Sequence, residues 1–468
     1  MSHFLDRVET ALHDDHLRGA LESATERLWS RRTAAFAGLE GADTIRDMAR
    51  RAKMDLLRDL AGNLETFEKN LIRNGIKVHW AQTGKEANRI VIDIAKAAGC
   101  KRAVKSKSMV TEETHLNHDL LNAGIDVLET DLGEYIVQLA DTTPSHIILP
   151  IIHMTRGDIG QIMHEKISVP YTDDPEELTK IARAKLRDAF LSADLGISGC
   201  NFGVIDSGTV CLVSNEGNAR LCTTLPRVHV AIMGIEKLVP SLADFDLMIK
   251  ILARSATGQK ITTYTSVISG PRRPGDPDGP EEMHVVLLDN GRANILGGEL
   301  AEILGCIRCG ACLNACPVYK NIGGHAYGDT YPGPIGAIVT PGLRGLKDWK
   351  ELPDASSLCG ACREVCPVRL DIPRMLLKLR QTGAEENRTP VSLRFMMKGF
   401  GIVVSRPWLY RLSVGWGGKA ARILAAKGWI HKLPGLAGGW TRSREMRAPA
   451  AKSFQTLWKE KKSWGSNG

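Results

Sequence analysis

Two closely spaced cysteine runs constrain this 468-residue chain more than any other feature. They are Cys306-x2-Cys309-x2-Cys312-x3-Cys316-Pro317 and Cys359-x2-Cys362-x3-Cys366-Pro367, and together they hold seven of the eleven cysteines. Such spacing directs several thiolates toward one metal centre, and thiolates are soft ligands that suit iron–sulfur clusters or zinc. Paired zinc knuckles need neither a third cysteine at x2 spacing nor the x3-Cys-Pro ending. The two runs therefore predict iron–sulfur clusters.

The ligands of the two predicted clusters are expected to cross between the runs. In two-cluster proteins the fourth cysteine of each run ligates the cluster of the other run. The first cluster then takes Cys306, Cys309, Cys312 and Cys366, and the second takes Cys316, Cys359 and Cys362. The expected cofactor is [4Fe–4S] in both sites, with [3Fe–4S] as the alternative in the second. Ser356 stands where a fourth cysteine of the second run would be, but its hydroxyl is a harder donor than a thiolate, and we favour a structural serine.

The chain before the cysteines divides into two regions. Residues 1–75 carry apolar residues at helical spacing and end at Gly75, which predicts an N-terminal helical arm packed on the next domain. Residues 76–298 alternate apolar strands with helices, which is typical of an α/β sheet covered on both faces. Strands are expected at 76–80, 102–105, 125–129, 146–150, 202–205, 209–213, 228–234, 261–267 and 284–288, and a long helix capped by an aspartate at 175–192.

Two further regions follow. Residues 299–385 form the cysteine domain, where Gly- and Pro-rich turns follow the first run and a helix begins after Asp371. Residues 386–468 form a basic, Trp-rich tail. Within it, residues 391–468 hold 15 Lys and Arg and two acidic residues, a local charge of +13. Because the whole chain has a net charge of +8, the rest of the chain has −5. We favour an arm that docks on a partner subunit or on the acidic body, and anionic lipid is an alternative. No nucleic-acid-binding fold accompanies the charge, so nucleic acid is not an expected partner.

The compartment follows from what the sequence lacks. The N-terminus has no basic stretch followed by an apolar one, and no window approaches the roughly 20 apolar residues that span a bilayer. Reduced, cluster-binding cysteines also indicate a reducing environment. We therefore expect a cytoplasmic protein, with peripheral contact at the inner membrane as an open alternative.

A second candidate site lies in the α/β region. Glycines and small polar residues follow strand ends, where α/β sheets bind phosphate-like or carboxylate ligands. They are Gly196–Thr209 and Ser214–Asn218, and Ser106, Lys107, Ser108 and Glu129 are candidates for the same cleft. Ordinary tight turns are the alternative that we favour. The other four cysteines, Cys100, Cys200, Cys211 and Cys222, lack ligand spacing and are predicted to be core residues, with Cys200 beside the Gly-rich turn as the one to watch.

The chain also resembles a known family. The resemblance rests on both cysteine runs, extended through Tyr319 and Pro373, and on His79-Trp80-Ala81, Pro144-Ser-His-Ile-Ile-Leu-Pro150, Asp206-Ser-Gly-Thr209 and Asn215-Glu-Gly-Asn218. With these stretches the chain resembles the lactate-utilisation iron–sulfur protein family, known as LutB or YkgF, over nearly its whole length. The resemblance implies an α/β LUD domain, related to ribose-5-phosphate isomerase and CoA-transferase folds, followed by an α-helical ferredoxin domain with two clusters.

The same resemblance implies a role in oxidising L-lactate to pyruvate, with this chain as electron carrier. It implies two partners: a redox protein with cysteine-rich CCG modules and a smaller LUD-domain protein. No nicotinamide or flavin motif is present, so hydride abstraction has no evident centre on this chain, and no catalytic residue is predicted. The alternatives are a cluster subunit of a glycolate or other 2-hydroxyacid dehydrogenase, and a small-molecule-binding module whose clusters sense redox state. A zinc-binding structural protein is a remote third.

Overall fold

A computed structural model describes residues 4–386, 391–441 and 444–464. The chain forms two compact units, Met1–Glu385 and Glu386–Gly468. The first unit combines the helical arm, the α/β region and the cysteine region, and the second is the basic tail.

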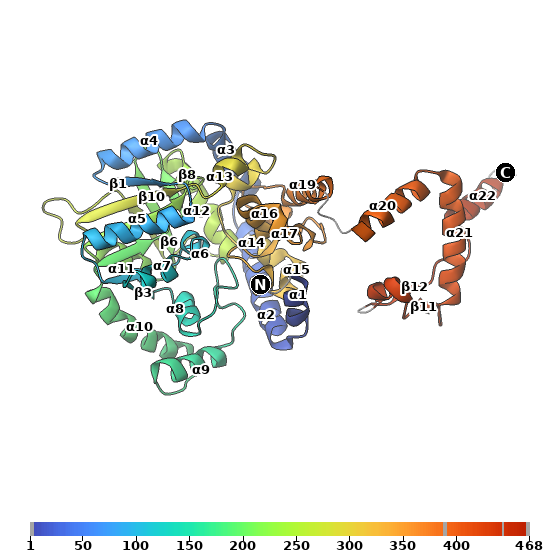
Figure 1. The fold of residues 1–468 in the computed structure, drawn as a ribbon, viewed down its shortest axis with the longest axis horizontal. Helices are drawn as coiled ribbons and strands as arrows, with labels where there is room; N and C mark the ends of the chain where they lie inside the picture. Colours follow the sequence, from blue (N-terminus) through green and yellow to red (C-terminus); the bar gives the residue numbers. More distant parts are fainter. Residues whose placement is uncertain (1–3, 387–390, 442–443, 465–468) are drawn as a thin grey trace. The chain divides into compact units, whose positions relative to one another are not determined.

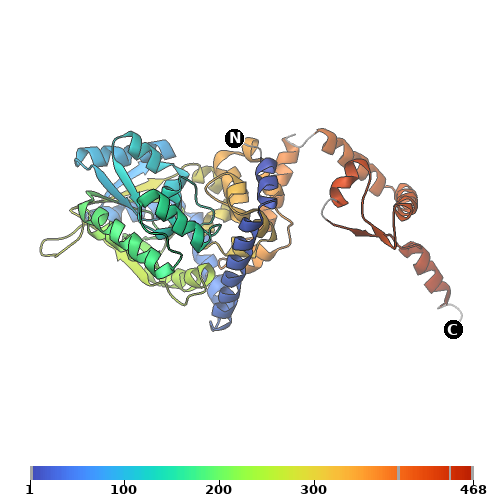
Figure 2. The same cartoon turned by 90° about the horizontal axis from the view of Figure 1, so that it is seen from below.

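Four helices form the N-terminal arm: α1 (Phe4–Leu12), α2 (Asp15–Ala37), α3 (Ala42–Arg58) and α4 (Leu60–Arg73). Asp14 caps α2 and Asp59 caps α4, each accepting a hydrogen bond from a first-turn N–H. Gly75 ends the arm as predicted, and it adopts the left-handed conformation, with φ +84°. Helices α1 and α2 run beside the cysteine region, whereas α4 packs on the first strand of the sheet (Figures 1 and 2). The arm therefore touches both later regions, not only the next one.

A six-stranded parallel sheet is the centre of the α/β region (Figure 1). Its strands, in spatial order, are β1 (Lys77–Ala81), β10 (Glu282–Leu288), β7 (Val228–Gly234), β4 (Leu195–Ser198), β2 (Arg102–Lys105) and β3 (Asp126–Glu129). Alternate residues of β10 enter different cores: Val285 packs with the arm, and Val286 packs with the helix that follows β1. This is the predicted sheet with both faces covered.

The helices of the region connect these strands. They are α5 (Gly84–Ala97), α6 (Met109–Glu113), α7 (Leu116–Asn122), α8 (Leu132–Leu139), α9 (Arg156–Ile167), α10 (Pro175–Ser192), α11 (Asn218–Thr224), α12 (Leu242–Ala256) and α13 (Arg292–Leu296). Asp174 caps α10 as predicted, by accepting hydrogen bonds from the N–H groups of Glu176 and Glu177. Helices α6 and α7 are separate, because His115 between them adopts φ +56°.

A second, mixed sheet of four strands was not foreseen as a separate layer. Its order is β8 (Leu238–Val239), β5 (Phe202–Val204), β6 (Thr209–Ser214) and β9 (Tyr264–Ile268). The β5–β6 and β6–β9 pairs are antiparallel, whereas β5 and β8 are parallel. The sequence pattern predicted a single sheet, whereas the structure divides these strands between two sheets.

The strand predicted at 146–150 is wrong. The segment forms turns. Its backbone N–H groups bond to the His146 ring and not to a neighbouring strand: Nδ1 accepts from Ile148 N at 3.0 Å and from Leu149 N at 3.1 Å. Its apolar residues are buried instead against the cysteine region, where His146 Nε2 donates to Asn314 Oδ1 at 3.2 Å. Burial lowers the pKa of His146 to about 3, in keeping with a neutral ring that has one donor and one acceptor nitrogen.

The cysteine region consists of short helices joined by turns. They are η1 (Ala301–Gly305), α14 (Ala311–Ala315), α15 (Pro317–Ile322), η2 (His325–Tyr327), α16 (Gly333–Arg344), α17 (Leu346–Trp349), η3 (Leu352–Asp354), α18 (Ala361–Val365) and α19 (Ile372–Glu385). The Asp371 carboxylate accepts a hydrogen bond from Arg374 N at 3.3 Å, so it stands at the start of α19 as predicted.

The second unit contains α20 (Val391–Val404), α21 (Pro407–Ile423), a two-stranded sheet of β11 (Trp429–Ile430) and β12 (Met446–Arg447), η4 (Gly435–Thr441) and α22 (Phe454–Trp464). No residue of α20 or α21 is buried. Among the described helices of both units, none has the length and apolar content to cross a bilayer.

Candidate iron–sulfur and ligand-binding sites

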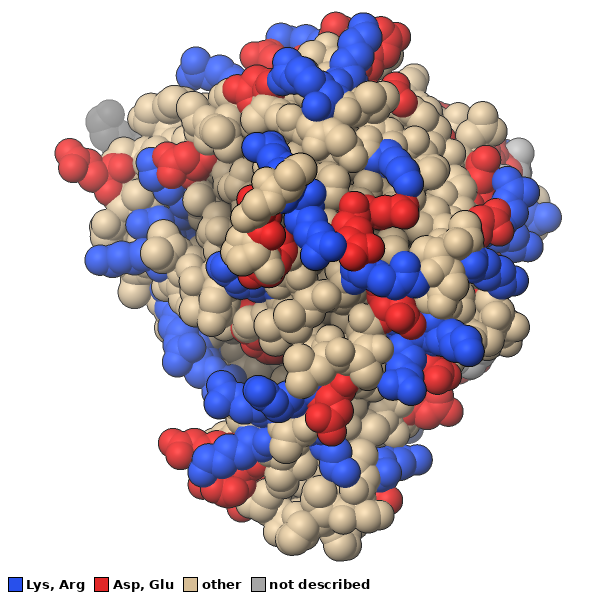
Figure 3. All heavy atoms as spheres, turned by 90° about the vertical axis from the view of Figure 1, so that its left-hand side faces the viewer, with Lys and Arg blue, Asp and Glu red and all other residues tan. Residues whose placement is uncertain are grey.

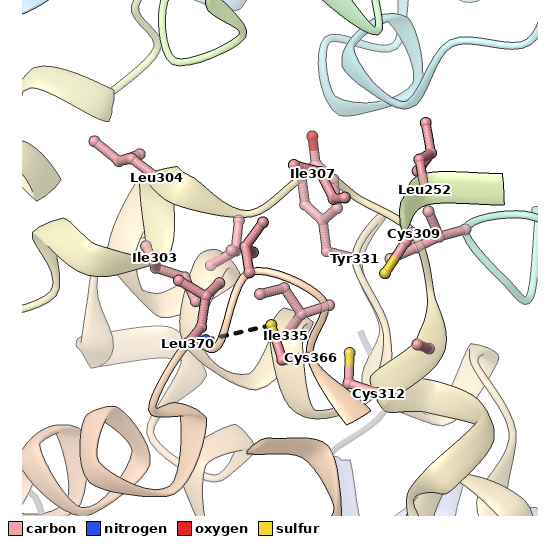
Figure 4. Close-up of a cluster of buried hydrophobic side chains, with 14 of the residues drawn as sticks. Leu252, Ile303, Leu304, Ile307, Cys309, Cys312, Tyr331, Ile335, Cys366 and Leu370 are labelled. Carbon is pink, nitrogen blue, oxygen red and sulfur yellow. Dashed lines mark hydrogen bonds between the residues drawn. The ribbon is translucent and has the colours of Figure 1, made fainter. Parts of the chain in front are cut away.

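Four thiols of the cysteine region line one small cavity. They belong to Cys306, Cys309, Cys312 and Cys366, and the rest of the lining is mostly apolar. Figure 4 shows the sulfurs of Cys309, Cys312 and Cys366 pointing toward the same space, beside Ile335 and Leu370. The fold thus brings Cys366 of the second run to the three cysteines of the first.

Both runs use the same backbone conformation. Cys309 in the first run and Cys359 in the second each lie between two left-handed residues. The preceding residues are Arg308 (φ +57°) and Leu358 (φ +54°), and the following residues are Gly310 (φ +74°) and Gly360 (φ +87°). A five-residue helix then carries the next cysteine, in α14 and in α18. A side chain at Gly310 would also meet His146 Cε1 at 3.1 Å, so glycine is required there for conformation and for space.

Backbone N–H groups point at the sulfurs of both runs. Arg308 N donates to Cys306 Sγ at 3.4 Å, and Leu370 N donates to Cys366 Sγ at 3.3 Å (Figure 4). Such bonds favour the thiolate form and are one of the means by which a protein tunes a cluster. Burial nevertheless raises the pKa of the Cys366 thiol to about 11, so in the metal-free protein it holds its proton.

The remaining three thiols form a second group. Burial, together with the charges of Cys316 and Cys359, raises the pKa of the Cys362 thiol to about 12. Burial also raises the pKa of Cys316, while N–H groups of Val318 and Tyr319 oppose the shift. Cys359 is exposed, unlike the others, so this group reaches the protein surface. Cys312 of the first group lies close enough to Cys362 for its pKa to be raised by that neighbour, so the two groups adjoin.

Ser356 takes the position of the missing cysteine in the repeat. Its Oγ accepts a hydrogen bond from Leu358 N at 3.1 Å, two residues on, as the Cys306 sulfur does from Arg308 N. The local fold of the first run is thus preserved in the second with oxygen in place of sulfur.

Arginines of the N-terminal arm hold the end of the second run. Arg32 donates to Val365 O at 2.7 Å, and Arg46 donates to Glu364 O at 2.6 Å and Cys366 O at 2.8 Å. These bonds occupy carbonyl groups at the end of α18 that have no partner within the helix. They also place positive charge next to the first group of thiols.

The donor set fits iron–sulfur clusters. Seven thiolate-forming side chains lie in two adjoining groups with apolar surroundings and N–H groups directed at sulfur, the arrangement in which such clusters are held. Within the described residues, no three His, Cys, Asp or Glu side chains converge closely enough to hold a single metal ion. In a [4Fe–4S] cluster each thiolate binds a different iron, so the thiols surround the cluster and do not converge on one atom.

The larger cavity of the first unit lies at the carboxyl edge of the parallel sheet. Its volume is about 320 Å³, within the range of small-molecule sites. Residues that directly follow β2, β3, β4, β7 and β10 line it, including Lys107, Asp131, Asn201, Lys237 and Arg292. The carboxyl edge is where open α/β sheets bind their ligands.

The candidate cleft of the sequence analysis is confirmed in part. Ser106, Lys107, Ser108, Gly199, Cys200, Asn201, Ser214, Asn215, Glu216 and Asn218 all line this cavity. The β5–β6 turn does not, because Asn70 and Asn74 of the arm donate to its carbonyl groups and a side chain at Gly208 would collide with Asn70. Glu129 is also elsewhere, bound to Lys105 at 2.6 Å. Cys100, Cys200, Cys211 and Cys222 are all buried, which confirms their predicted place in the core.

A buried ion network joins the two regions behind this cavity. The Arg292 guanidinium binds both oxygens of Glu113, at 2.9 and 2.8 Å, and Glu236 Oε2 at 2.7 Å. Tyr331 of the cysteine region donates to Glu113 Oε2 at 2.6 Å. Burial acts to raise the pKa of Glu113, but the Arg292 charge and these hydrogen bonds outweigh it and lower the pKa to about 2.

Sequence reasoning found Lys107 but missed the other three cationic residues that line the cavity. Lys237 and Arg292 follow the buried strands β7 and β10 closely, and charged residues just after a buried parallel strand are a usable signal. Arg308 gave no such signal, because it lies within the first cysteine run and only the fold brings it to the cavity.

Comparison with known proteins agrees with this architecture. Residues 64–288 match the LUD domain, residues 302–370 a 4Fe-4S dicluster domain, and residues 378–463 the C-terminal domain of lactate utilisation protein B. The chain is thus an iron–sulfur protein in which a LUD domain precedes a ferredoxin-like dicluster domain.

Relatives of the same length narrow this class. Lactate utilization protein B of Bacillus licheniformis is 45% identical over 461 residues, which cover 98% of this chain and 97% of the relative. Its namesake in Bacillus subtilis strain 168 is 44% identical over 454 residues, 97% and 95% of the two chains. The chain belongs to the lactate utilisation protein B family. A crystal structure of a DUF162 family protein from Deinococcus radiodurans covers 49% of this chain and 98% of its own, at 15% identity and a TM-score of 0.27.

Proposed function

We propose that this chain is the iron–sulfur electron-transfer subunit of a system that oxidises L-lactate to pyruvate. The observation that carries the proposal is the adjacency of the two thiol groups, in which Cys312 of one group neighbours Cys362 of the other. The names of its relatives, lactate utilization protein B, supply the substrate. Iron–sulfur clusters, when bound, provide one-electron transfer.

The ligand assignment is part of the proposal. Cys306, Cys309, Cys312 and Cys366 hold one [4Fe–4S] cluster, and Cys316, Cys359 and Cys362 hold a second cluster, [4Fe–4S] or [3Fe–4S]. The first group is enclosed by apolar side chains that exclude water, whereas the exposed Cys359 brings the second to the surface. The second group is therefore the side at which an electron partner docks. We also propose that the LUD domain shares the fold of ribose-5-phosphate isomerase and CoA transferases.

The proposed partners are a CCG-module redox protein and a smaller LUD-domain protein. The sequence carries no nicotinamide or flavin motif, so lactate oxidation itself is assigned to a partner. The tail supports peripheral contact with the inner membrane of a cytoplasmic protein. Its helices α20 and α21 expose large apolar side chains, such as Phe395 and Trp416, among basic residues. The face of the first unit drawn in Figure 3 has basic and acidic side chains interspersed, so this face offers no acidic area to the tail.

The test is to reconstitute the complex anaerobically and to record electron paramagnetic resonance and visible spectra after adding L-lactate. We expect L-lactate to reduce the clusters only when the partner proteins are present. Reduction by glycolate but not by L-lactate would assign the chain to another 2-hydroxyacid dehydrogenase. Clusters that partner proteins can neither reduce nor reoxidise would refute the carrier role.

A further inference from the structure

Two cations face the 320 Å³ cavity of the α/β region without a hydrogen-bond acceptor. Arg308 is 9% exposed, its Nη1 is buried without a partner, and its nearest carboxylate oxygen is Glu236 Oε1 at 3.8 Å, beyond hydrogen-bond distance. The Lys237 ammonium makes no side-chain hydrogen bond or ion pair with any residue that the structure describes. A buried donor without an acceptor is costly, which indicates that an acceptor comes from outside the chain.

The carboxylates near these two residues are bound to another cation. Three cations stand at this end of the cavity: Arg292, Arg308 and Lys237. The two buried carboxylates of the network, Glu113 and Glu236, are both bound to Arg292, and Glu236 Oε1 lies 3.8 Å from Arg308. Arg308 and Lys237 therefore keep hydrogen-bond donors that an anionic group in the cavity can use.

Arg308 is held in place for this contact. Its left-handed backbone, at φ +57°, belongs to the conformation that both cysteine runs share. Its guanidinium lies over the Tyr331 ring, with Cζ 4.6 Å from the ring centroid. The Tyr331 hydroxyl is in turn bound to Glu113. The guanidinium is therefore preorganised and keeps a free edge for a bidentate acceptor.

The rest of the cavity favours a carboxylate over phosphate. Asp131 and Glu216 line its other part together with the single cation Lys107, and the excess of acidic groups there would repel a doubly charged anion more than a singly charged one. Ser106, Ser108 and Asn201 also line it and can bind a hydroxyl or carbonyl group. A planar carboxylate matches the fork geometry of a guanidinium.

We propose that the LUD-domain cavity binds a small organic carboxylate, whose carboxylate group lies between Lys237 and Arg308. This site is distinct from the thiol groups and goes beyond the electron-transfer role. It lies against the first thiol group nonetheless, because Arg308 is part of the loop between Cys306 and Cys309, and Ile147 and Arg308 line both cavities.

The test is calorimetric titration of the full, cluster-loaded chain under anaerobic conditions, with L-lactate, pyruvate and inorganic phosphate as separate probes. We expect one molecule of L-lactate or pyruvate to bind per chain, and Lys237→Met to weaken binding at least tenfold. Lys237→Arg keeps the charge and should restore most of the affinity. Lys85→Met, at an exposed lysine of α5, is the matched control and should bind like the wild type.

A second readout separates binding from a structural role. Because Lys237→Met removes an unpaired, half-buried charge, the ligand-free variant should unfold at the same temperature as the wild type or higher, and added carboxylate should no longer raise that temperature. Iron and sulfide contents of the same samples report on the clusters independently, and Lys237→Gln replaces Lys237→Met if the latter loads poorly. Absence of carboxylate binding, unchanged binding in the Lys237 variants, or tighter binding of phosphate would each overturn the proposal.

Discussion

Ser356 Oγ accepts a hydrogen bond from Leu358 N at 3.1 Å, the same bond that Cys306 Sγ accepts from Arg308 N at 3.4 Å in the other run. The second run thus has the backbone of a complete ligand run with one sulfur replaced by oxygen. Both following cysteines of the run, Cys359 and Cys362, keep their positions in this repeat.

This equivalence predicts that Ser356→Cys completes the second thiol group. We expect the variant to hold about eight irons per chain as two [4Fe–4S] clusters, and any three-iron signal of the wild type to disappear. Ser356→Ala is the control, and because the wild-type site has only three thiols it should leave the iron content of the wild type unchanged. Iron and sulfide analysis with electron paramagnetic resonance decides the matter. A three-iron signal that persists in Ser356→Cys would contradict the equivalence.

The crossing of the runs predicts the effect of Cys366→Ser. Because Cys366 lines the cavity of Cys306, Cys309 and Cys312, the substitution should remove or convert the cluster of that group. Cys316→Ser should act on the group of Cys359 and Cys362, and since the groups adjoin, each variant should also perturb the spectrum of the neighbouring cluster. The spectra of the two variants, compared with Cys100→Ser as a core-cysteine control, test this. The assignment is wrong if Cys366→Ser affects only the group of Cys359 and Cys362.

Arg292→Met should destabilise the first unit by about 3–5 kcal/mol, because it leaves the Glu113 and Glu236 carboxylates buried without their common cation. Denaturant unfolding followed by circular dichroism measures the loss. Arg89→Met is the matched control: this arginine is 70% exposed and lies 3.9 Å from Glu86, so its loss should cost about 0–1 kcal/mol. An equal loss of unfolding free energy in the two variants would show that the buried network stabilises the unit no more than an exposed ion pair does.

The same network predicts an acid dependence. The pKa of Glu113 is lowered to about 2, below the roughly 4.3 of an unfolded glutamate, so its ionised form stabilises the fold fully above about pH 5. This stabilisation is lost as the pH falls through about 2, where the native carboxyl becomes protonated. Wild type should therefore unfold at a higher temperature than Glu113→Gln at neutral pH, and the gap should narrow with acid. Parallel melts at equal iron content test this, and a gap independent of pH would refute it.

The tail should bind anionic membranes. Trp408 and Trp416 are 64% and 69% exposed, and the surrounding sequence carries a charge of +13 over residues 391–468. We expect the full chain to float with vesicles that contain anionic lipid, to be released by salt, and to bind several-fold less when both tryptophans are replaced by alanine. Trp29→Ala, within the first unit, is the control. Equal binding to uncharged vesicles would contradict the electrostatic part of the prediction.

Local patterns carried much of the fold. Five of the six parallel strands, the Asp174 cap and the Gly75 stop follow from periodicity and from capping chemistry, and the structure has all of them. The sixth strand, β4, was not predicted, because its residues from Gly196 onward lie in the Gly-rich turn. The segment 146–150 shows where this reasoning fails: its apolar residues are buried as a strand's would be, but against a region that is distant in sequence. The spacing of apolar residues indicates which residues are buried, but it does not indicate which part of the chain covers them.

The candidate sites show the same division. Cysteine spacing is local, so the four-and-three grouping of thiols could be proposed from the runs alone. The cavity could be foreseen only where residues follow strand ends, as Ser106 and Asn201 do. Arg308 was not predicted because only the folded structure brings the cysteine region to the α/β region. There the guanidinium lies over Tyr331, and Lys237 lines the same cavity.

The arginines of α2 and α3 have a consequence for the order in which the protein is made. Arg32 and Arg46 leave the ribosome first, yet their acceptors, the carbonyl groups of Val365 and Cys366, are among the last parts of the unit to be synthesised. A growing chain therefore exposes Cys306, Cys309 and Cys312 before the segment that completes their surroundings exists. Four-thiol ligation by the first group therefore requires that residue 366 has been synthesised, and a chain that stops before it offers only three thiols at that site.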